Sequence, residues 1–261
     1  MESEIVYLMY HELEIPGRPL CQTEAGYVRY ILAATDFRAQ MQSLKDANRQ
    51  GLSVGQALTF PAKQSVTITF DDGCETDLLL AAPILKEFGF GATFYITSGL
   101  VGTRGYLSAQ QVRELDALGF EIGCHSMTHA YLPDLDDARL REEIAGAKEK
   151  LEQILGRPVE HFSCPGGRYD QRVKDVARAA GYRTVATSRI HANSKSTDLF
   201  ALGRVAMMRD TKLKTFSALC DGSGLWQLAI RDRVRQGAKR VLGNSFYDRV
   251  RARALRDGTT H

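Results

Sequence analysis

Short runs of apolar, β-branched and aromatic residues recur along the chain and are separated by longer amphipathic stretches. Residues 5–11 (IVYLMYH) and 65–70 (SVTITF) have the length and composition of buried strands. The same pattern predicts further strands within residues 92–97, 120–126, 161–165, 182–187 and 199–207. The chain is therefore expected to contain a series of short, largely buried strands.

Between these runs the apolar positions have helical spacing. The first amphipathic stretch places Phe37, Met41 and Leu44 on one helix face, and Thr35 or Asp36 is the expected cap. Further helices are predicted within residues 75–89, 108–118, 136–156 and 170–181. Strands that alternate with helices indicate an α/β fold with a parallel sheet, and the chain length and number of strands favour a barrel over an open sheet.

Polar residues follow four of the predicted strands at the point where each strand ends. They are His11, the pair Asp71 and Asp72, His125, and the turn 165–167. Because chemistry in such barrels gathers at the carboxyl ends of the strands, we expect these residues to share one site.

The segment HSMTH supplies His125 and His129, spaced so that a helical turn or a tight loop directs both imidazoles the same way. Together with an aspartate they would form a two-histidine, one-carboxylate set for a divalent metal. A pair of histidines on a helix surface is the alternative interpretation. The remaining histidines without such neighbours, His161, His191 and His261, are expected to be surface or packing residues.

The adjacent carboxylates of Asp71 and Asp72 suit two different tasks. Successive side chains of an extended strand point to opposite sides, so one can bind a metal while the other accepts a proton from water. Gly73 would permit the sharp turn that follows. A solvated turn in which an aspartate caps the next helix is the alternative.

TFDDG at residues 69–73 and HSMTH at residues 125–129, in this order and with helices between them, resemble the first two motifs of the polysaccharide deacetylases. This family is also called carbohydrate esterase family four or the nodulation-protein-B homology domain. The resemblance implies a distorted (β/α) barrel with about seven parallel strands. It also implies hydrolysis of N-acetyl groups from amino sugars.

Carried over by position, the resemblance implies that Asp71 is the general base and that Asp72, His125 and His129 are metal ligands. The implied cofactor is a divalent metal, first Zn²⁺, with Co²⁺, Ni²⁺ or Mn²⁺ as alternatives. Catalysis would combine general base chemistry with electrostatic stabilisation of a tetrahedral oxyanion.

The third motif departs from the family pattern. Many members have Arg-x-Pro, whereas this chain has SCPGG, with Ser163 where the arginine would stand. Pro165 and Gly167 still fit a groove-forming loop. Arg204 is a candidate for orienting Asp71 in place of the missing arginine, and a surface strand arginine is the alternative.

The general acid is a second departure, because the family's C-terminal strand followed by histidine is missing. The segment LMYH near the N-terminus has the same pattern, as in deacetylases that resemble biofilm-polysaccharide enzymes. We therefore assign His11 as the acid that protonates the leaving amine, with His191 as the fallback. A packing role for His11 is the alternative.

The five cysteines are odd in number and lack paired CxxC spacing, so neither a disulfide framework nor a structural zinc cluster is expected. Cys74, Cys124 and Cys164 each lie beside a motif residue. Thiolate ligands are one interpretation, and small packing residues are the preferred one.

The net charge of +3 is unevenly distributed. Residues 226–261 carry nine Lys/Arg and three Asp, a net charge of +6, which leaves −3 for the other 225 residues. We divide the chain into a catalytic barrel (1–221) and a basic, amphipathic helical tail (222–261). The tail either packs on the barrel, which is preferred, or lies on anionic lipid as a peripheral membrane contact, and no nucleic acid partner is expected.

The N-terminus has no basic segment followed by a long apolar run, which predicts a cytoplasmic protein, with the inner face of the membrane as an alternative location. The leading hypothesis is metal-dependent removal of acetyl from an N-acetylated sugar in a glycan, lipid-linked sugar or oligosaccharide. A catalytically silent glycan-binding barrel, or a hydrolase of another carbon–nitrogen bond such as a cyclic amide or imide, are the alternatives.

Overall fold

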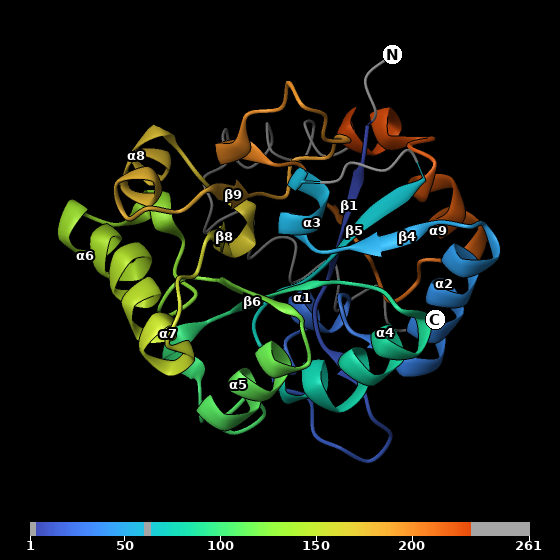
Figure 1. The fold of residues 1–261 in the computed structure, drawn as a ribbon, viewed down its shortest axis with the longest axis horizontal. Helices are drawn as coiled ribbons and strands as arrows, with labels where there is room; N and C mark the ends of the chain where they lie inside the picture. Colours follow the sequence, from blue (N-terminus) through green and yellow to red (C-terminus); the bar gives the residue numbers. More distant parts are fainter. Residues whose placement is uncertain (1–3, 60–63, 231–261) are drawn as a thin grey trace.

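A curled parallel sheet forms the centre of the molecule (Figure 1). The computed structural model describes residues 4–59 and 64–230. Within them the strand order is β10-β1-β5-β6-β7-β8-β9, with β4 beside β5, and every pairing is parallel. The strands are β1 (Val6–Tyr10), β4 (Gln50–Leu52), β5 (Ser65–Phe70), β6 (Thr93–Ile96), β7 (Glu121–Cys124), β8 (His161–Ser163), β9 (Thr184–Ala186) and β10 (Val205–Ala206). A separate parallel pair joins β2 (Leu13–Glu14) to β3 (Leu32–Ala33).

One segment reaches both edges of this sheet. Val205 of β10 pairs with Leu8 of β1, and three residues earlier Leu202 forms a parallel bridge with Ala186 of β9. The sheet therefore curls into a half-barrel, which confirms the predicted distorted (β/α) barrel.

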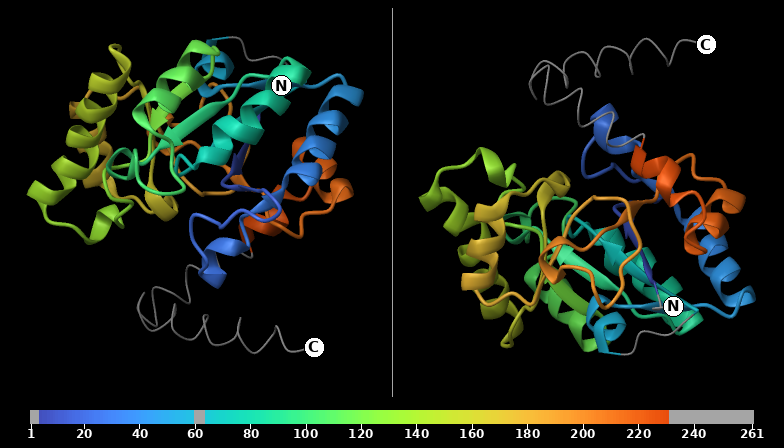
Figure 2. Two further views of the ribbon diagram at one scale, coloured as in Figure 1. Left: turned by 90° about the horizontal axis from the view of Figure 1, so that it is seen from below. Right: turned by 90° about the horizontal axis from the view of Figure 1, so that it is seen from above.

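Helices surround this sheet (Figures 1 and 2). They are α1 (Ala25–Val28), α2 (Ala34–Asp46), α3 (Val54–Thr59), α4 (Ala82–Phe88), α5 (Ala109–Ala117), α6 (Asp137–Arg141), α7 (Ala147–Leu155), α8 (Gln171–Ala179) and α9 (Leu213–Cys220). Single π-helical turns, Asp77–Ala81 and Glu142–Gly146, precede α4 and α7. Short 3-10 turns lie at Ser98–Leu100, Leu132–Asp134, Pro165–Gly167 and Leu199–Ala201.

An aromatic ladder crosses three neighbouring strands and anchors the first long helix. The ring of Phe70 stacks on Tyr10 of β1 at 5.2 Å and on Phe94 of β6 at 5.1 Å between centroids. Phe37 of α2 meets Tyr10 edge-on at 5.0 Å. Because the strands are covered on both faces, every residue of β1, β5 and β6 is buried, including the two threonines of β5.

Two predicted boundaries are wrong. Helix α2 begins two or three residues earlier than expected, with Ala33 at the N-cap position and no side-chain cap, because β3 runs directly into the helix. Thr35 and Asp36 lie in the first turn, where the aspartate still complements the helix dipole. The predicted strand 199–207 is a 3-10 turn at its start, and only Val205–Ala206 is strand.

Five short elements were not predicted: β2, β3, β4, α1 and α3. Each has too few residues to show a readable alternation or helical spacing. In β4, Gly51 is buried, and a Cβ there would come within 2.5 Å of Ile68 Cδ1. Its glycine therefore permits close packing of β4 on the core.

The chain still contacts the core beyond α9. Leu225 is buried and Leu228 packs against the core, whereas Trp226 and Ile230 are 65% and 49% exposed. Most of the predicted tail, residues 231–261, lies outside the described residues. Among the helices that are described, none is both long and apolar enough to cross a membrane.

Candidate active site

The carboxyl ends of neighbouring strands bring the predicted site residues together. Asp71 and Asp72 follow β5, His125 follows β7, and His11 follows β1. Both aspartates and His125 are buried, with 2%, 4% and 1% of their surface exposed. Charged groups at this depth need partners, so the geometry around each one indicates its task.

Asp72, His125 and His129 form a compact group of metal-ligating atoms. Asp72 Oδ1 lies 3.5 Å from His125 Nε2 and 3.4 Å from His129 Nε2. The three ligand atoms lie within 4.8 Å of one another. Asp72 and His125 are buried, while the His129 side chain is 38% exposed, so the group opens toward solvent at His129.

The hydrogen bonds of His125 test whether a cation fits this group. Its Nδ1 lies 2.9 Å from the carbonyl oxygen of Ser163. Since a carbonyl only accepts, Nδ1 must carry the ring proton, and the Nε2 lone pair faces Asp72. Burial lowers the pKa of His125 to about 4, so the ring is neutral near pH 7.

Asp72 Oδ1 is buried and has no hydrogen-bond partner within the described part of the chain. A carboxylate oxygen and an imidazole lone pair therefore face each other with no proton between them. A divalent cation satisfies both, and a carbonyl that fixes the histidine tautomer is the usual support of such a ligand. The residues fit a metal.

Backbone strain is concentrated in the same place. Asp72, Ser126 and His129 have φ of 81°, 63° and 64°, and only Asn48 shares a positive φ among the described non-glycine residues. Such conformations cost free energy and cluster at functional sites. The segment 125–129 is a tight loop, one of the two geometries expected from its spacing.

Strand alternation does not separate the two aspartates, so the prediction that their side chains point to opposite sides is wrong. Strand β5 ends at Phe70, and the left-handed Asp72 and Gly73 replace the extended geometry that would have separated the side chains. Both carboxylates face the same imidazole, because Asp71 Oδ2 lies 3.8 Å from His125 Nε2. Their partners, rather than strand alternation, distinguish them.

Arg204 binds Asp71 in a two-pronged ion pair. Nη1 lies 2.7 Å from Oδ1 and Nη2 lies 2.8 Å from Oδ2. The guanidinium is buried, and its Nε donates to the carbonyl of Thr187 at 3.0 Å. Burial raises the pKa of Asp71, but the charges of Arg204 and His125 outweigh it and hold the pKa well below its usual range. Asp71 is thus a fixed, ionised carboxylate.

Ser163 contributes a hydroxyl to this arrangement. Arg204 Nη2 donates to Ser163 Oγ at 2.7 Å, and that hydroxyl lies 3.4 Å from both oxygens of Asp71. Ser163 occupies the motif position at which many family members carry arginine. Its hydroxyl accepts a hydrogen bond from an arginine of another segment. Arg204 is therefore not a surface strand residue.

Glu143 is a site residue that the sequence did not reveal. It is 1% exposed, and its carboxylate accepts the backbone N–H groups of Met127 and Thr128 at 3.0 and 2.8 Å. It also accepts from the Thr128 hydroxyl. A buried glutamate in an otherwise charged helix is hidden among exposed acidic residues, so only the fold distinguishes it.

His11 is half-buried at the edge of the site. Its ring lies 4.9 Å from that of Tyr30, and its buried Nδ1 has no hydrogen-bond partner in the described structure. Burial lowers the pKa of His11, against the opposing charges of Asp72 and Asp71. The fallback, His191, instead packs beside Gly203, and its Nδ1 lies 3.0 Å from the carbonyl of Ala192.

Pro165 and Gly167 form the 3-10 turn after β8. Gly167 has φ of 66°, and a Cβ there would come within 1.9 Å of Ser188 Oγ, so the turn packs tightly against the next strand connection.

Cys124 and Cys164 are buried members of the hydrophobic core. His161 is buried too, with Nδ1 2.9 Å from Thr184 Oγ1.

Comparisons with known proteins agree with this geometry. Residues 60–185 match the family model described as polysaccharide deacetylase, a segment that contains both aspartates and the HSMTH loop. The chain is 34% identical over 124 residues to a peptidoglycan-N-acetylglucosamine deacetylase of Bacillus cereus, a match that covers 47% of this chain and 56% of that protein. It is 31% identical over 173 residues to a poly-beta-1,6-N-acetyl-D-glucosamine N-deacetylase of Staphylococcus aureus, covering 59% and 60%.

The matched segments thus span less than two thirds of either relative's length. The fold is similar to that of the Streptococcus pyogenes deacetylase PplD, solved in complex with acetate, with a TM-score of 0.74, 24% identity and coverage of 84% of this chain and 99% of that one. In sequence and in fold the chain is thus similar to the polysaccharide deacetylases.

Proposed function

We propose that this chain is a metal-dependent N-deacetylase, which hydrolyses the N-acetyl group of an amino sugar in a glycan, lipid-linked sugar or oligosaccharide and releases acetate. One observation carries the proposal. The partnerless Oδ1 of Asp72 faces the lone pair of His125, and an ionised Asp71 lies beside them, held by Arg204.

The donor set of one carboxylate and two imidazoles suits Zn²⁺, with Co²⁺, Ni²⁺ and Mn²⁺ as alternatives. When bound, the cation would polarise the acetamide carbonyl and lower the pKa of water. Asp72, His125 and His129 would hold it, and the partly exposed His129 marks the side from which substrate approaches.

Asp71 is proposed to accept the proton of the attacking water. Arg204 and Ser163 fix both of its oxygens, so the carboxylate cannot rotate away from His125. Its low pKa makes it a weak base, and it therefore releases the accepted proton readily. The bond to acetyl carbon forms from water oxygen, and the carbon–nitrogen bond breaks.

His11 is proposed to return a proton to the leaving amine. Burial keeps its ring neutral near pH 7 in the free protein, so it must gain the proton during the reaction. The proton that water loses is then balanced by the one that the amine gains.

The substrate class rests on the relatives. The two named above act on peptidoglycan N-acetylglucosamine and on poly-beta-1,6-N-acetyl-D-glucosamine, which share one N-acetylated sugar. We propose an N-acetylglucosamine-containing glycan for this chain. The buried pair of Arg204 and Asp71 supports catalysis over a silent glycan-binding barrel, since orienting a base has no use in a binding module.

The test is acetate release from N-acetylglucosamine oligosaccharides by metal-loaded full-length protein, compared with two variants. His125→Ala should lose stoichiometric metal and activity together. Asp71→Asn keeps the shape of the side chain, so metal should stay while kcat falls about 10²- to 10⁴-fold. Binding of the sugars without acetate release would favour the silent barrel, and turnover of cyclic imides instead would favour the other hydrolase.

A further inference from the structure

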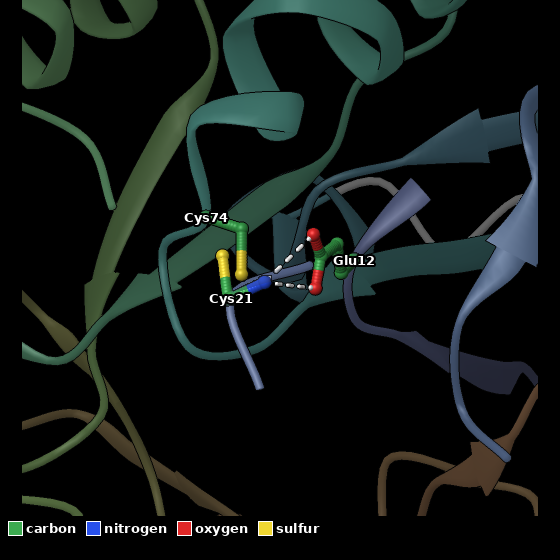
Figure 3. Close-up of side chains that lie close together, drawn as sticks. All are labelled: Glu12, Cys21 and Cys74. Carbon is green, nitrogen blue, oxygen red and sulfur yellow. Dashed lines mark hydrogen bonds between the residues drawn. The ribbon is translucent and has the colours of Figure 1, made fainter. Parts of the chain in front are cut away.

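A second group of metal-ligating side chains lies outside the site described above. Glu12, Cys21 and Cys74 have ligand atoms that all lie within 4.8 Å of one another (Figure 3). Glu12 precedes β2, Cys21 lies in the loop before α1, and Cys74 follows the left-handed turn at Gly73. Three separate segments therefore converge on one point.

Hydrogen bonds that involve backbone groups connect these segments. The N–H of Cys21 donates to both carboxylate oxygens of Glu12, at 3.1 Å each. The thiol of Cys21 donates to the carbonyl of Gly105 at 2.9 Å, and Cys74 forms an antiparallel bridge with Tyr106. The side chains of Cys21 and Tyr27 also hydrogen-bond to Glu12, and since a carboxylate has about four lone-pair sites, at least one remains for another partner.

The surroundings of this group are acidic and buried. Glu12 is 3% exposed and Cys74 is fully buried, and none of the ion pairs between described residues involves Glu12. A carboxylate that loses water without gaining a cation is costly. Hydrogen bonds offset part of this cost for Glu12, and a bound cation would offset the rest.

Asp77 adds an independent observation. It is 1% exposed, and neither carboxylate oxygen has a hydrogen-bond partner within the described part of the chain. Its N–H donates to the carbonyl of Cys74 at 3.0 Å. Burial raises the pKa of Asp77 well above its usual range, and the charges of Asp72, then Cys21 and Glu12, act in the same direction.

We propose that Glu12, Cys21 and Cys74 form a second metal site, which takes a thiophilic divalent cation, first Zn²⁺. On binding, two metal–sulfur bonds and one metal–oxygen bond form, and the two thiol protons pass to solvent. Asp77 or water completes a tetrahedral set. Thiolate ligands distinguish this site from the nitrogen and oxygen donors of Asp72, His125 and His129.

A route from solvent exists. Cys21 and Gly105 line a surface pocket of about 540 Å³, together with Arg18 and Glu75. The metal would tie the loop after β1 to the turn that carries Asp71 and Asp72, which is a structural task and does not depend on the proposed reaction.

The test counts metal in full-length protein that has been purified under reducing conditions, loaded with Zn²⁺ and freed of excess. The wild type should hold two equivalents, and Cys21→Ser, at the more exposed thiol, should hold one. His125→Ala should also hold one, and the double variant none. Cys220→Ser removes a buried thiol outside the group and should still hold two.

The ligands are identified in His125→Ala, in which only the second site is loaded. Cobalt should give thiolate-to-metal charge-transfer absorption, which Cys21→Ser and Cys74→Ser should each abolish, and zinc X-ray absorption should show sulfur at about 2.3 Å. Two equivalents in both cysteine variants would overturn the site. So would one equivalent in the wild type with Cys21 and Cys74 found as a disulfide. Two equivalents in His125→Ala would instead refute the metal of the proposed deacetylase and leave the cysteine site standing.

Discussion

The carboxylate of Asp71 is oriented by a guanidinium from a distant segment. Arg204 lies between the bridge at Leu202 and strand β10, so the curl of the sheet brings it over the end of β5. Ser163, at the position where the family pattern has arginine, accepts from Arg204. Positions 163 and 204 therefore lie beside the same carboxylate, although they belong to different segments. An arginine at either position can form the ion pair with Asp71.

This exchange can be tested by moving the arginine. Arg204→Ser should lower kcat about 100-fold, because Asp71 loses its fixed geometry. It also leaves a buried carboxylate unpaired, which costs about 3–5 kcal/mol of unfolding free energy. The double variant Ser163→Arg with Arg204→Ser should recover part of both losses, measured as acetate release and as thermal unfolding.

The matched control for this exchange is Arg189→Ser, which removes an exposed arginine near the same strands. It should change neither quantity. Wild-type turnover in Arg204→Ser would show that Asp71 needs no orienting cation.

The acid role proposed for His11 can be tested separately from the rest of the reaction. His11→Ala should lower acetate release from an N-acetylated sugar about 10²- to 10⁴-fold, because the amine leaves only with a proton. Hydrolysis of 4-nitrophenyl acetate should fall much less, since its leaving group departs as an anion. His191→Ala, assayed in parallel, tests the fallback: a loss confined to that variant would transfer the acid role.

At the scale of elements, the loop at residues 125–129 depends on its neighbour, the π-helical turn Glu142–Gly146. Glu143 accepts two backbone N–H groups of the loop, and Ser126 Oγ accepts the N–H of His129. Left-handed residues in this loop are strained, so these contacts must hold it in place. The helix thereby sets the separation of the two imidazoles.

Glu143→Gln should therefore weaken metal binding. The amide keeps the size of the side chain but loses charge and one acceptor oxygen, and changes of this kind around a ligand cost about 10- to 100-fold in affinity. Competition with a chromophoric chelator measures the effect. Glu142→Gln alters the exposed neighbour and should bind metal as the wild type does, and equal affinities for both variants would remove Glu143 from the site.

At the scale of the whole molecule, the barrel and the basic C-terminal segment differ in charge. Residues 226–261 carry a net charge of +6, and Trp226 and Ile230 at the start of this segment are exposed. Basic residues near an anionic membrane contribute about 1 kcal/mol each, and exposed apolar side chains can insert at the interface.

Deletion of residues 226–261 should accordingly reduce the fraction of protein that pellets with anionic vesicles. Neutral vesicles and high salt serve as controls, because each removes the attraction. An unchanged pellet would indicate that the segment packs on the barrel alone. Deacetylation of a soluble oligosaccharide should continue in the truncated protein, since its site residues all precede the deletion.

What the sequence determined by itself is local. Apolar runs predicted β1, β5, β6, β7, β8 and β9, helical spacing predicted the longer helices, and the TFDDG and HSMTH motifs predicted which residues gather at the strand ends. Each of these signals lies within a few consecutive residues. Elements of two or three residues, such as β4, carry no such signal and were missed.

Only the tertiary structure decided which distant side chains became partners. Arg204 meets Asp71 because the sheet curls, and Glu143 meets the loop at 127–128 because a helix packs there. Cys21 and Cys74 meet because the loop after β1 folds over the turn after β5, although their spacing resembles no metal motif. Such pairings depend on strand order and curvature, which act between segments and leave no periodicity within any one of them.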